Sequence, residues 1–223
     1  MKKQGVLLGV LVMVALVGGV QAGEGPARAE AGTDAHTWQA DYRIADAQGH
    51  HDLRIVMDDG RIEYRAPGEP VRQWRRVADG VELREIEAGA ARVIVHAPGD
   101  LRVLDREPDW VQLRYWGMGG TAAGWQPGSS AQVKLGDHQR YAAQQWQPPT
   151  TASAQPLQWI AAAGVPALYR HGDHTWRLTA LTAVDASAFT SSAGLEEIDA
   201  ADVEDRIQIE GAPPNSVPHT HAH

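Results

Sequence analysis

Residues 52–65 read Asp-Leu-Arg-Ile-Val-Met-Asp-Asp-Gly-Arg-Ile-Glu-Tyr-Arg, and this stretch decides the fold class. The Asp59-Gly60 pair readily adopts the positive φ angles that a tight hairpin turn requires. After the turn, Ile62 and Tyr64 alternate with three charged residues, so one face of an extended segment is apolar and the other is charged. The stretch therefore predicts a β-hairpin with a dry face and a wetter face.

The same pattern recurs along most of the chain. Short runs with a period of two are separated by turn residues such as Asp79-Gly80 and Pro98-Gly99-Asp100, and helical spacing fits these runs less well. We therefore predict a mainly β protein, an antiparallel sheet with few short helices, in a single domain over residues 37–209. The expected strands are 38–44, 52–57, 61–65, 71–77, 81–86, 92–96, 101–104, 110–116, 157–161 and 175–184, with one long strand or two paired strands over 132–146 and a helical turn over 162–169.

The first 22 residues have the features of a secretory signal peptide. Lys2 and Lys3 precede an apolar run over residues 5–20, and Val20-Gln21-Ala22 ends in the small-x-small pattern that signal peptidase recognises. The run is shorter than the ~20 residues that a membrane-spanning helix needs. We expect cleavage after Ala22, a periplasmic location and no stable membrane span afterwards. An uncleaved inner-membrane anchor is the alternative.

The composition excludes several classes of chemistry. The 223 residues include no cysteine, so the chain has no disulfide, thiol nucleophile, thiolate zinc site or lipid-modified cysteine. A net charge of −8 argues against nucleic-acid binding, which needs a basic surface. Residues 23–36 predict a flexible lead, and residues 210–223 predict a disordered tail that contains histidine.

The segment from Leu157 onward resembles the exported LolA-like superfamily, which includes the carrier of outer-membrane lipoproteins. The resemblance rests on Trp159-Ile160-Ala161, Gly164-Val165-Pro166, the run 176–184 and an ending that runs from Phe189 to Gly194-Leu-Glu-Glu-Ile198. Two departures are Ser192, where many members have a proline, and Gly136-Asp-His-Gln-Arg140, where they have a Gly-x-x-Cys-like element. The resemblance implies a half-barrel, that is, a curved antiparallel sheet around an apolar cavity that carries an acyl chain in some members. It transfers no catalytic residue.

Candidate ligand contacts come from the dry face and from one loop. A strand over 110–116 would place alternate apolar side chains together, and the glycine-rich loop 117–128 carries two more large apolar residues. Loops often carry binding residues, and clustered exposed apolar groups mark interaction sites. The candidates are Ile62, Val93, Val95, Val111, Leu113, Tyr115, Met118 and Trp125, although the strand residues equally describe a closed core.

Histidines offer the other chemical lead. His219, His221 and His223 alternate at the C-terminus, where an extended chain would present three imidazoles to a weakly bound Zn²⁺ or Cu²⁺ ion. A solvated tail without metal is the alternative. Two further groups, His50-His51-Asp52 and His171-Gly-Asp-His174, could chelate a metal, but their glycines favour polar turns.

These observations predict a periplasmic protein that is not an enzyme and needs no cofactor. It would bind a lipid, another apolar or amphipathic ligand, or an envelope protein on its curved sheet, by burying apolar surface. A metal-binding protein that uses the C-terminal histidines is the first alternative. An unrecognised hydrolase-type enzyme is the second, although the chain has no His-Glu-x-x-His or Gly-x-Ser-x-Gly motif and no phosphate-binding glycine loop.

Overall fold

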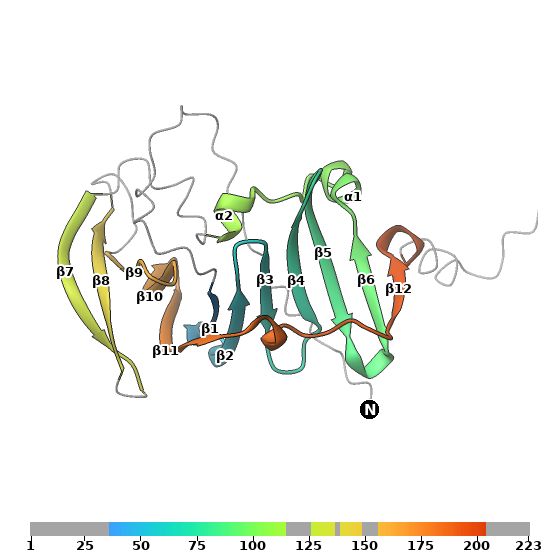
Figure 1. Cartoon of the computed structure of the whole chain (residues 1–223). Coiled ribbons are helices and arrows are strands. Elements are labelled where there is room, and N and C mark those ends of the chain that lie inside the picture. Colours follow the sequence, from blue (N-terminus) through green and yellow to red (C-terminus); the bar gives the residue numbers. More distant parts are fainter. Residues whose placement is uncertain (1–35, 115–125, 137–138, 149–155, 204–223) are drawn as a thin grey trace, which may run out of the picture.

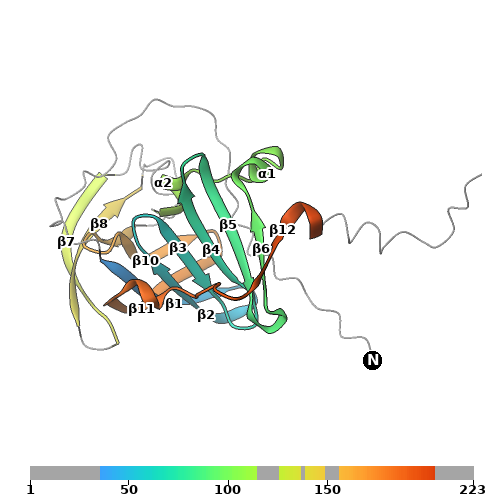
Figure 2. The same cartoon turned by 45° about the vertical axis from the view of Figure 1, so that its right-hand side comes forward.

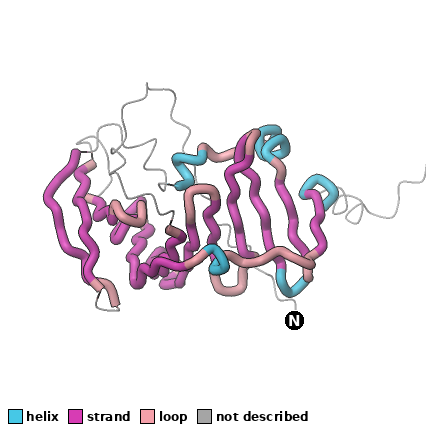
Figure 3. Tube along the Cα trace, in the orientation of Figure 1, coloured by secondary structure: helices cyan, strands magenta, loops and turns pink. Residues whose placement is uncertain are grey.

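A computed structural model describes residues 36–114, 126–136, 139–148 and 156–203, which form one large open sheet (Figure 1). The strand order is β12-β6-β5-β4-β3-β2-β1-β11-β10-β9-β8-β7, and every pair is antiparallel except β12–β6. The mainly β prediction is confirmed, and strands dominate the tube drawing in Figure 3. The strands are β1 (Thr37–Asp46), β2 (Gly49–Met57), β3 (Arg61–Arg65), β4 (Val71–Val77), β5 (Gly80–Glu87), β6 (Arg92–His96), β7 (Gln126–Lys134), β8 (Arg140–Gln147), β9 (Leu157–Ile160), β10 (Val165–His171), β11 (His174–Val184) and β12 (Glu196–Asp199).

Two of the expected strands are helices. Residues 101–104 fall mostly in α1 (Pro98–Val103), and residues 110–114 form α2 (Trp110–Arg114). The reason for α1 is local, because Pro98 stands at the start of the helix and the Asp100 carboxylate accepts a hydrogen bond from Ala97 N at 3.2 Å. The expected helical turn over 162–169 is also wrong from Val165 onward, because residues 165–169 belong to β10. The described chain has two short 3₁₀ segments as well, Ala88–Ala90 and Ala186–Ala188.

Two of the tight turns that the sequence predicts are present. Asp58–Gly60 joins β2 to β3, and the Asp58 carboxylate accepts hydrogen bonds from Gly60 N and Arg61 N at 2.8 and 2.7 Å. Asp79-Gly80 likewise joins β4 to β5. Residues 132–146 form two paired strands rather than one long strand, because Lys134 lies opposite Arg140.

The pairing from β2 to β6 divides the side chains between two faces of the sheet. Cross-strand partners point to the same face, and neighbours in one strand point to opposite faces. Ile62 therefore shares a face with Trp74 and Leu83, which we call the inner face. Glu63 shares the opposite, outer face with Gln73.

The sheet curls between β7 and β11. Gly136, just after β7, donates a backbone hydrogen bond of 3.1 Å to Thr179 in β11, although three strands lie between β7 and β11 in the order. In a flat sheet those two strands would be about 19 Å apart. The Tyr141 hydroxyl in β8 similarly donates to Leu181 O at 2.5 Å. The turned view in Figure 2 shows the resulting curvature.

A β-bulge at Thr179 accounts for the hydrogen bond between Gly136 and Thr179. Asp41 pairs with Ala180 and Tyr42 pairs with Leu178, so Thr179 is an extra residue in β11. Its hydroxyl donates to Asp41 O at 2.9 Å, and its carbonyl accepts the bond from Gly136. The bulge also changes the phase of the strand, because Leu178 and Leu181 both belong to the main core.

The main core lies on the inner face. Its buried members come from β1, β2, β3 and the curled part of the sheet, and they include Tyr42, Ile55, Met57 and Ile62, each at most 2% exposed. Trp110 and Leu113 of α2 pack against this core, so α2 covers part of the inner face. The Tyr42 hydroxyl is satisfied by Pro166 O at 2.8 Å.

The C-terminal part of the described chain crosses the outer face. After β11, residues 185–195, which we call the strap, run past β2 and β3 to reach the far edge of the sheet (Figure 1). There β12 pairs in parallel with β6, with Glu196 opposite Arg92. The strap thus connects the middle of the sheet to one of its edges.

No helix of the described residues has the length and apolar character that crossing a membrane requires. The predicted signal peptide (1–22) lies outside the described residues. The same holds for the flexible lead, except for its last residue, and for the C-terminal tail.

Candidate functional site

Three large apolar side chains are exposed in the described part of the chain, and all three lie close together in sequence. Val103 is 86% exposed, Leu104 40% and Val111 48%. They belong to α1, to the residue after it, and to α2. We call residues 98–114 the α1–α2 surface. Clustered exposed apolar side chains are typical of interaction sites, whereas single ones are ordinary.

The linker between the two helices is fixed to the β4–β5 hairpin. The carbonyl of Leu101 accepts hydrogen bonds from Arg106 N and Glu107 N at 2.7 and 3.1 Å. Arg102 Nη1 donates to Asp79 O at 2.9 Å and to the Glu107 carboxylate at 3.3 Å. These bonds hold the exposed apolar residues on a positioned segment, so that little ordering remains to be done on binding.

A cavity of about 460 Å³ opens beside this segment. Apolar atoms come from Val77, Val81, Pro108 and Trp110, and charges stand at Arg76, Glu107 and Asp109. Val81 and Arg76 pair across β4 and β5 and therefore lie on one face of the sheet, the inner face. The cavity is of a size that accommodates a few side chains.

On the same face, a polar group spans three strands. The Glu85 carboxylate lies 3.3 Å from His96 Nε2 and 3.4 Å from Arg72 Nε. The hydrogen bond with His96, followed by the charges of His96 and Arg72, holds the pKa of Glu85 below its ordinary value of 4.5. Glu85 is therefore ionised at neutral pH. Its hydrogen bonds keep Arg72 and His96 at fixed positions on the sheet.

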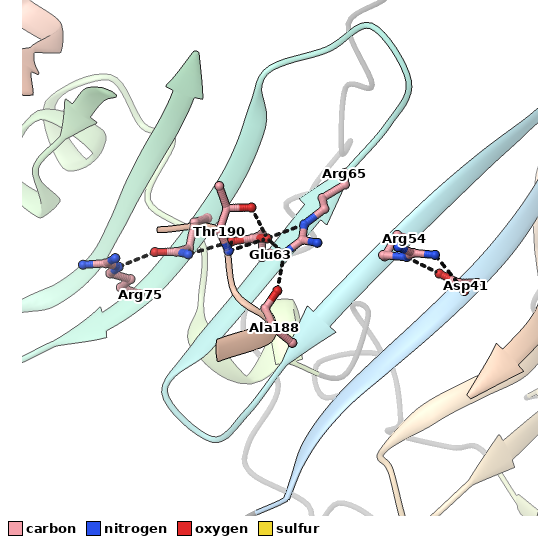
Figure 4. Close-up of polar contacts among 8 residues, drawn as sticks. Asp41, Arg54, Glu63, Arg65, Arg75, Ala188 and Thr190 are labelled. Atoms are coloured by element: carbon pink, nitrogen blue, oxygen red, sulfur yellow. Dashed lines mark hydrogen bonds and ion pairs between the residues drawn. The ribbon is translucent and has the colours of Figure 1, made fainter. Parts of the chain in front are cut away.

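The outer face carries a fully buried carboxylate under the strap. Glu63 is 0% exposed, and it accepts hydrogen bonds from Gln73 Nε2 at 2.7 Å and from Thr190 N and Oγ1 at 3.0 and 2.9 Å. Arg65 donates to it at 2.5 Å and also to Ala188 O (Figure 4). Phe189 packs under the Arg61 guanidinium, 4.0 Å from the ring centre. We interpret this network as the anchor of the strap.

The structure separates the predicted ligand-contacting residues. Ile62 is a buried core residue on the inner face. Val93 pairs with Ile86, and Ile86 pairs with Val71, which points to the same outer face as Gln73. Val93 and Val95 therefore lie on the outer face. The prediction that these three residues line one ligand site together is therefore wrong. The physical reason is that the register between paired strands decides which face each side chain reaches. In this register Ile62 points to one face, and Val93 and Val95 point to the other.

The predicted strand over 110–116 is wrong over residues 110–114, which form α2, so Val111 and Leu113 do not line a sheet together. In α2, Val111 is exposed while Leu113 packs against the core. Tyr115, Met118 and Trp125 lie outside the described residues, as do His219, His221 and His223. Among the described residues, no group of three or more His, Asp or Glu side chains is placed so that it could hold a metal ion.

Two features of the site were not expected from the sequence. Glu63 reads as an exposed charge in an alternating strand, because its partner Thr190 is 127 residues away. The exposure of Val103 and Leu104 was hidden by the expectation of a strand. The Pro98-Gly-Asp100 signal for a helix start was present and could have revealed it.

No protein-family model matches this chain. No curated protein matches it. Among solved structures, it is similar to PNGF-II, at 12% identity and a TM-score of 0.43, over 78% of this chain and 33% of that one. It is also similar to a chain of the Pseudomonas aeruginosa MucA/MucB complex, at 10% identity and a TM-score of 0.42, over 73% of this chain and 58% of that one.

A second structure, MucB in complex with MucA(peri), gives 11% identity and a TM-score of 0.38, over 73% of this chain and 57% of that one. The chain spans less than two thirds of the length of each of these three chains. Scores at this level establish neither a shared family nor a shared function. The open, curved, mainly antiparallel sheet is established by the structure of this chain itself.

Proposed function

We propose that this protein is an exported, non-enzymatic binding protein that docks an amphipathic segment of a partner protein on the α1–α2 surface. The observation that carries the proposal is that the exposed large apolar side chains of the described chain, Val103, Leu104 and Val111, lie in the same stretch of sequence as Glu107, Pro108, Asp109 and Trp110, which line a cavity of about 460 Å³. Membership of the LolA-like superfamily and a periplasmic location belong to the same proposal.

The chemistry of the surface supports a peptide segment of mixed character. Apolar side chains would bury against Val103, Val111 and the cavity floor, and each Å² of apolar area removed from water contributes ~25 cal/mol. Charges of both signs surround the cavity, since Arg76 lines it together with Glu107 and Asp109. Such a rim fits a partner segment whose polar residues flank a short apolar stretch.

A bound acyl chain is less well supported. On the inner face of β1–β3, Tyr42, Ile55 and Met57 are already buried against one another, at 0–1% exposed. An acyl chain would have to displace these packed side chains, which costs the contacts that they make. The exposed residues of the α1–α2 surface need no such displacement.

Site-specific photo-crosslinking tests the proposal. A photoreactive amino acid is placed at position 103 or, as a control, at position 182, because Thr182 is exposed in β11 and threonine has nearly the shape of valine. We expect one envelope protein to crosslink from position 103 and not from position 182. The identified partner is then purified and its affinity is measured for Val103→Asp, Val111→Asp and Thr182→Asp.

We expect the two valine variants to weaken binding roughly tenfold, the equivalent of 1.4 kcal/mol, and Thr182→Asp to leave it unchanged. Equal affinity in all three variants contradicts docking on the α1–α2 surface. Native mass spectrometry of the purified protein tests the alternative that the protein carries a lipid. A stoichiometric lipid whose retention is unaffected by Val103→Asp would replace the protein partner with a carried lipid.

A further inference from the structure

The C-terminal end of the described chain lies at the same end of the sheet as α1. β12 runs parallel to β6, so the two strands end side by side, and α1 follows β6 there (Figure 1). The β4–β5 hairpin is at this end too, because Leu83 near the start of β5 pairs with His96 at the end of β6. The hairpin in turn holds the α1–α2 surface through the bond from Arg102 to Asp79 O. The residues that follow Val203 therefore start near the α1–α2 surface.

These residues are numerous enough to reach that surface. Asp199 pairs with Val95, and Val95 pairs with Arg84 in β5. Gly80, in the hairpin, lies four residues further along β5 and two strands across from β12. At the usual spacings of about 4.8 Å between strands and 3.3 Å along a strand, this separation is roughly 16 Å. Seven extended residues, 204–210, span up to about 23 Å.

Residues 204–210, which we call the C-terminal segment, have the mixed character that the α1–α2 surface suits. They read Glu-Asp-Arg-Ile-Gln-Ile-Glu and lie outside the described residues. Ile207 and Ile209 alternate with polar residues, so an extended conformation would present both to one side. Carboxylates flank this apolar pair, at Glu204, Asp205 and Glu210.

Two arginines of the surface suit those carboxylates. Arg76 lines the cavity of about 460 Å³, Arg106 lies between α1 and α2, and both are exposed. Neither guanidinium makes a hydrogen bond or an ion pair with another described residue. The carboxylate of Glu107, by contrast, is paired with Arg102. Asp109 also lines the cavity and suits the single arginine of the C-terminal segment.

We propose that the C-terminal segment docks on the α1–α2 surface of its own chain and competes there with the partner segment. Ile207 and Ile209 bury against the exposed apolar side chains of that surface. The inference rests on the docking role proposed above and adds the regulation of that role. Because the segment is tethered, its effective concentration is on the order of millimolar, so a weak contact is enough to occupy the surface. The partner then binds with an affinity reduced to the fraction of molecules whose surface is free.

Photo-crosslinking in the purified full chain, with no partner present, tests the contact. The photoreactive amino acid is placed at position 103 or, as a control, at position 182 on β11. We expect a crosslink within one chain from position 103 to residues 204–210, mapped by mass spectrometry of the digest, and none from position 182. A product of twice the chain mass would assign the surface to a second copy and overturn the proposal. So would the absence of any crosslink to residues 204–210.

Substitutions with matched controls identify the groups that make the contact. Ile207→Asp should lower the crosslink yield several-fold, whereas Val217→Asp, beyond the C-terminal segment, should leave it unchanged. Arg76→Glu should lower it as well. Its control is Arg177→Glu, because Arg177 is an exposed strand arginine that makes no ion pair with another described residue. Thermal unfolding establishes that each variant is folded. Equal yields in the parent, Ile207→Asp and Arg76→Glu proteins would contradict the docking.

Partner affinity separates this inference from the proposed function. If the C-terminal segment covers the surface in two thirds to nine tenths of the molecules, Ile207→Asp should raise the affinity for the partner roughly three- to tenfold. Val217→Asp should not change it. A partner that crosslinks from position 103 and binds the parent and Ile207→Asp proteins equally would overturn the competition and leave the proposed function standing. A crosslink to residues 204–210 with no crosslinked partner would support the docking and contradict the proposed function.

Discussion

Replacing Glu63 by alanine tests whether the buried carboxylate anchors the strap. The substitution removes the acceptor shared by Gln73, Arg65 and Thr190. Gln73 is 0% exposed, so its amide cannot turn to water, whereas the Arg65 side chain is 28% exposed and can recover part of its hydration. Breaking a buried charged network by removing one partner costs roughly 3–5 kcal/mol.

The expected effect is large enough for simple measurements. For a domain of this size, 1 kcal/mol lowers the Tm by about 2–4 °C, so Glu63→Ala should lower it by roughly 6–20 °C. Urea unfolding should show the same loss of free energy of unfolding. Hydrogen exchange should also become faster at the amides of the strap and β12, because Thr190 loses its bond to the sheet.

Glu87→Ala is the matched control. Glu87 is also a strand glutamate with an arginine partner, Arg92 at 2.6 Å, but the pair lies on the surface. We expect a loss of at most about 1 kcal/mol there. Equal losses in Glu63→Ala and Glu87→Ala, or unchanged exchange in β12 of Glu63→Ala, would show that Glu63 does not anchor the strap.

Two further predictions concern the inner face. Gly164 has a φ of +65°, and an added Cβ would lie 3.0 Å from Arg114 Nη1. Gly172 has a φ of +59°, and an added Cβ would have nothing within 4 Å. Gly164→Ala should therefore lower the free energy of unfolding by about 1–3 kcal/mol, and by more than Gly172→Ala does. Equal losses in urea unfolding would show that the Arg114 contact has no effect. Because His96 lowers the pKa of Glu85, the pair stabilises the fold fully above pH 4.5 and loses this contribution as the pH falls through the lowered pKa. Urea unfolding of Glu85→Gln should therefore show a deficit near neutral pH that disappears in acid, and a deficit independent of pH would contradict the assignment.

Local alternation was enough to predict most of the sheet. The hairpins at Asp58–Gly60 and Asp79-Gly80 follow from turn residues between runs of period two, and both are present. The runs at 101–104 and 110–116 were too short for periodicity to distinguish strand from helix, and their described residues fall in or directly after α1 and in α2. For the first of these runs, Pro98 and Asp100 in the first turn of α1 were the better guide.

Long-range features could not be read from local patterns. The bulge at Thr179 brings Leu181 to the core beside Leu178, a shift that strict alternation does not allow. Glu63 looks like a solvated charge until the strap covers it. Asp46 lies 3.5 Å from His51 and 3.8 Å from His174, which is 128 residues away, only because β11 lies next to β1, and no local signal specifies which strands are neighbours.

The adjacency of β1 and β11 has a consequence for biosynthesis. The β1–β6 part of the sheet is made first, but the free edge of β1 has no partner until residues 174–184 follow, about 130 residues later. During that interval a row of unpaired backbone groups beside an apolar face is open to other chains. Pairing across such a sequence separation also forms slowly, so the newly made chain depends on protection from association until β11 arrives.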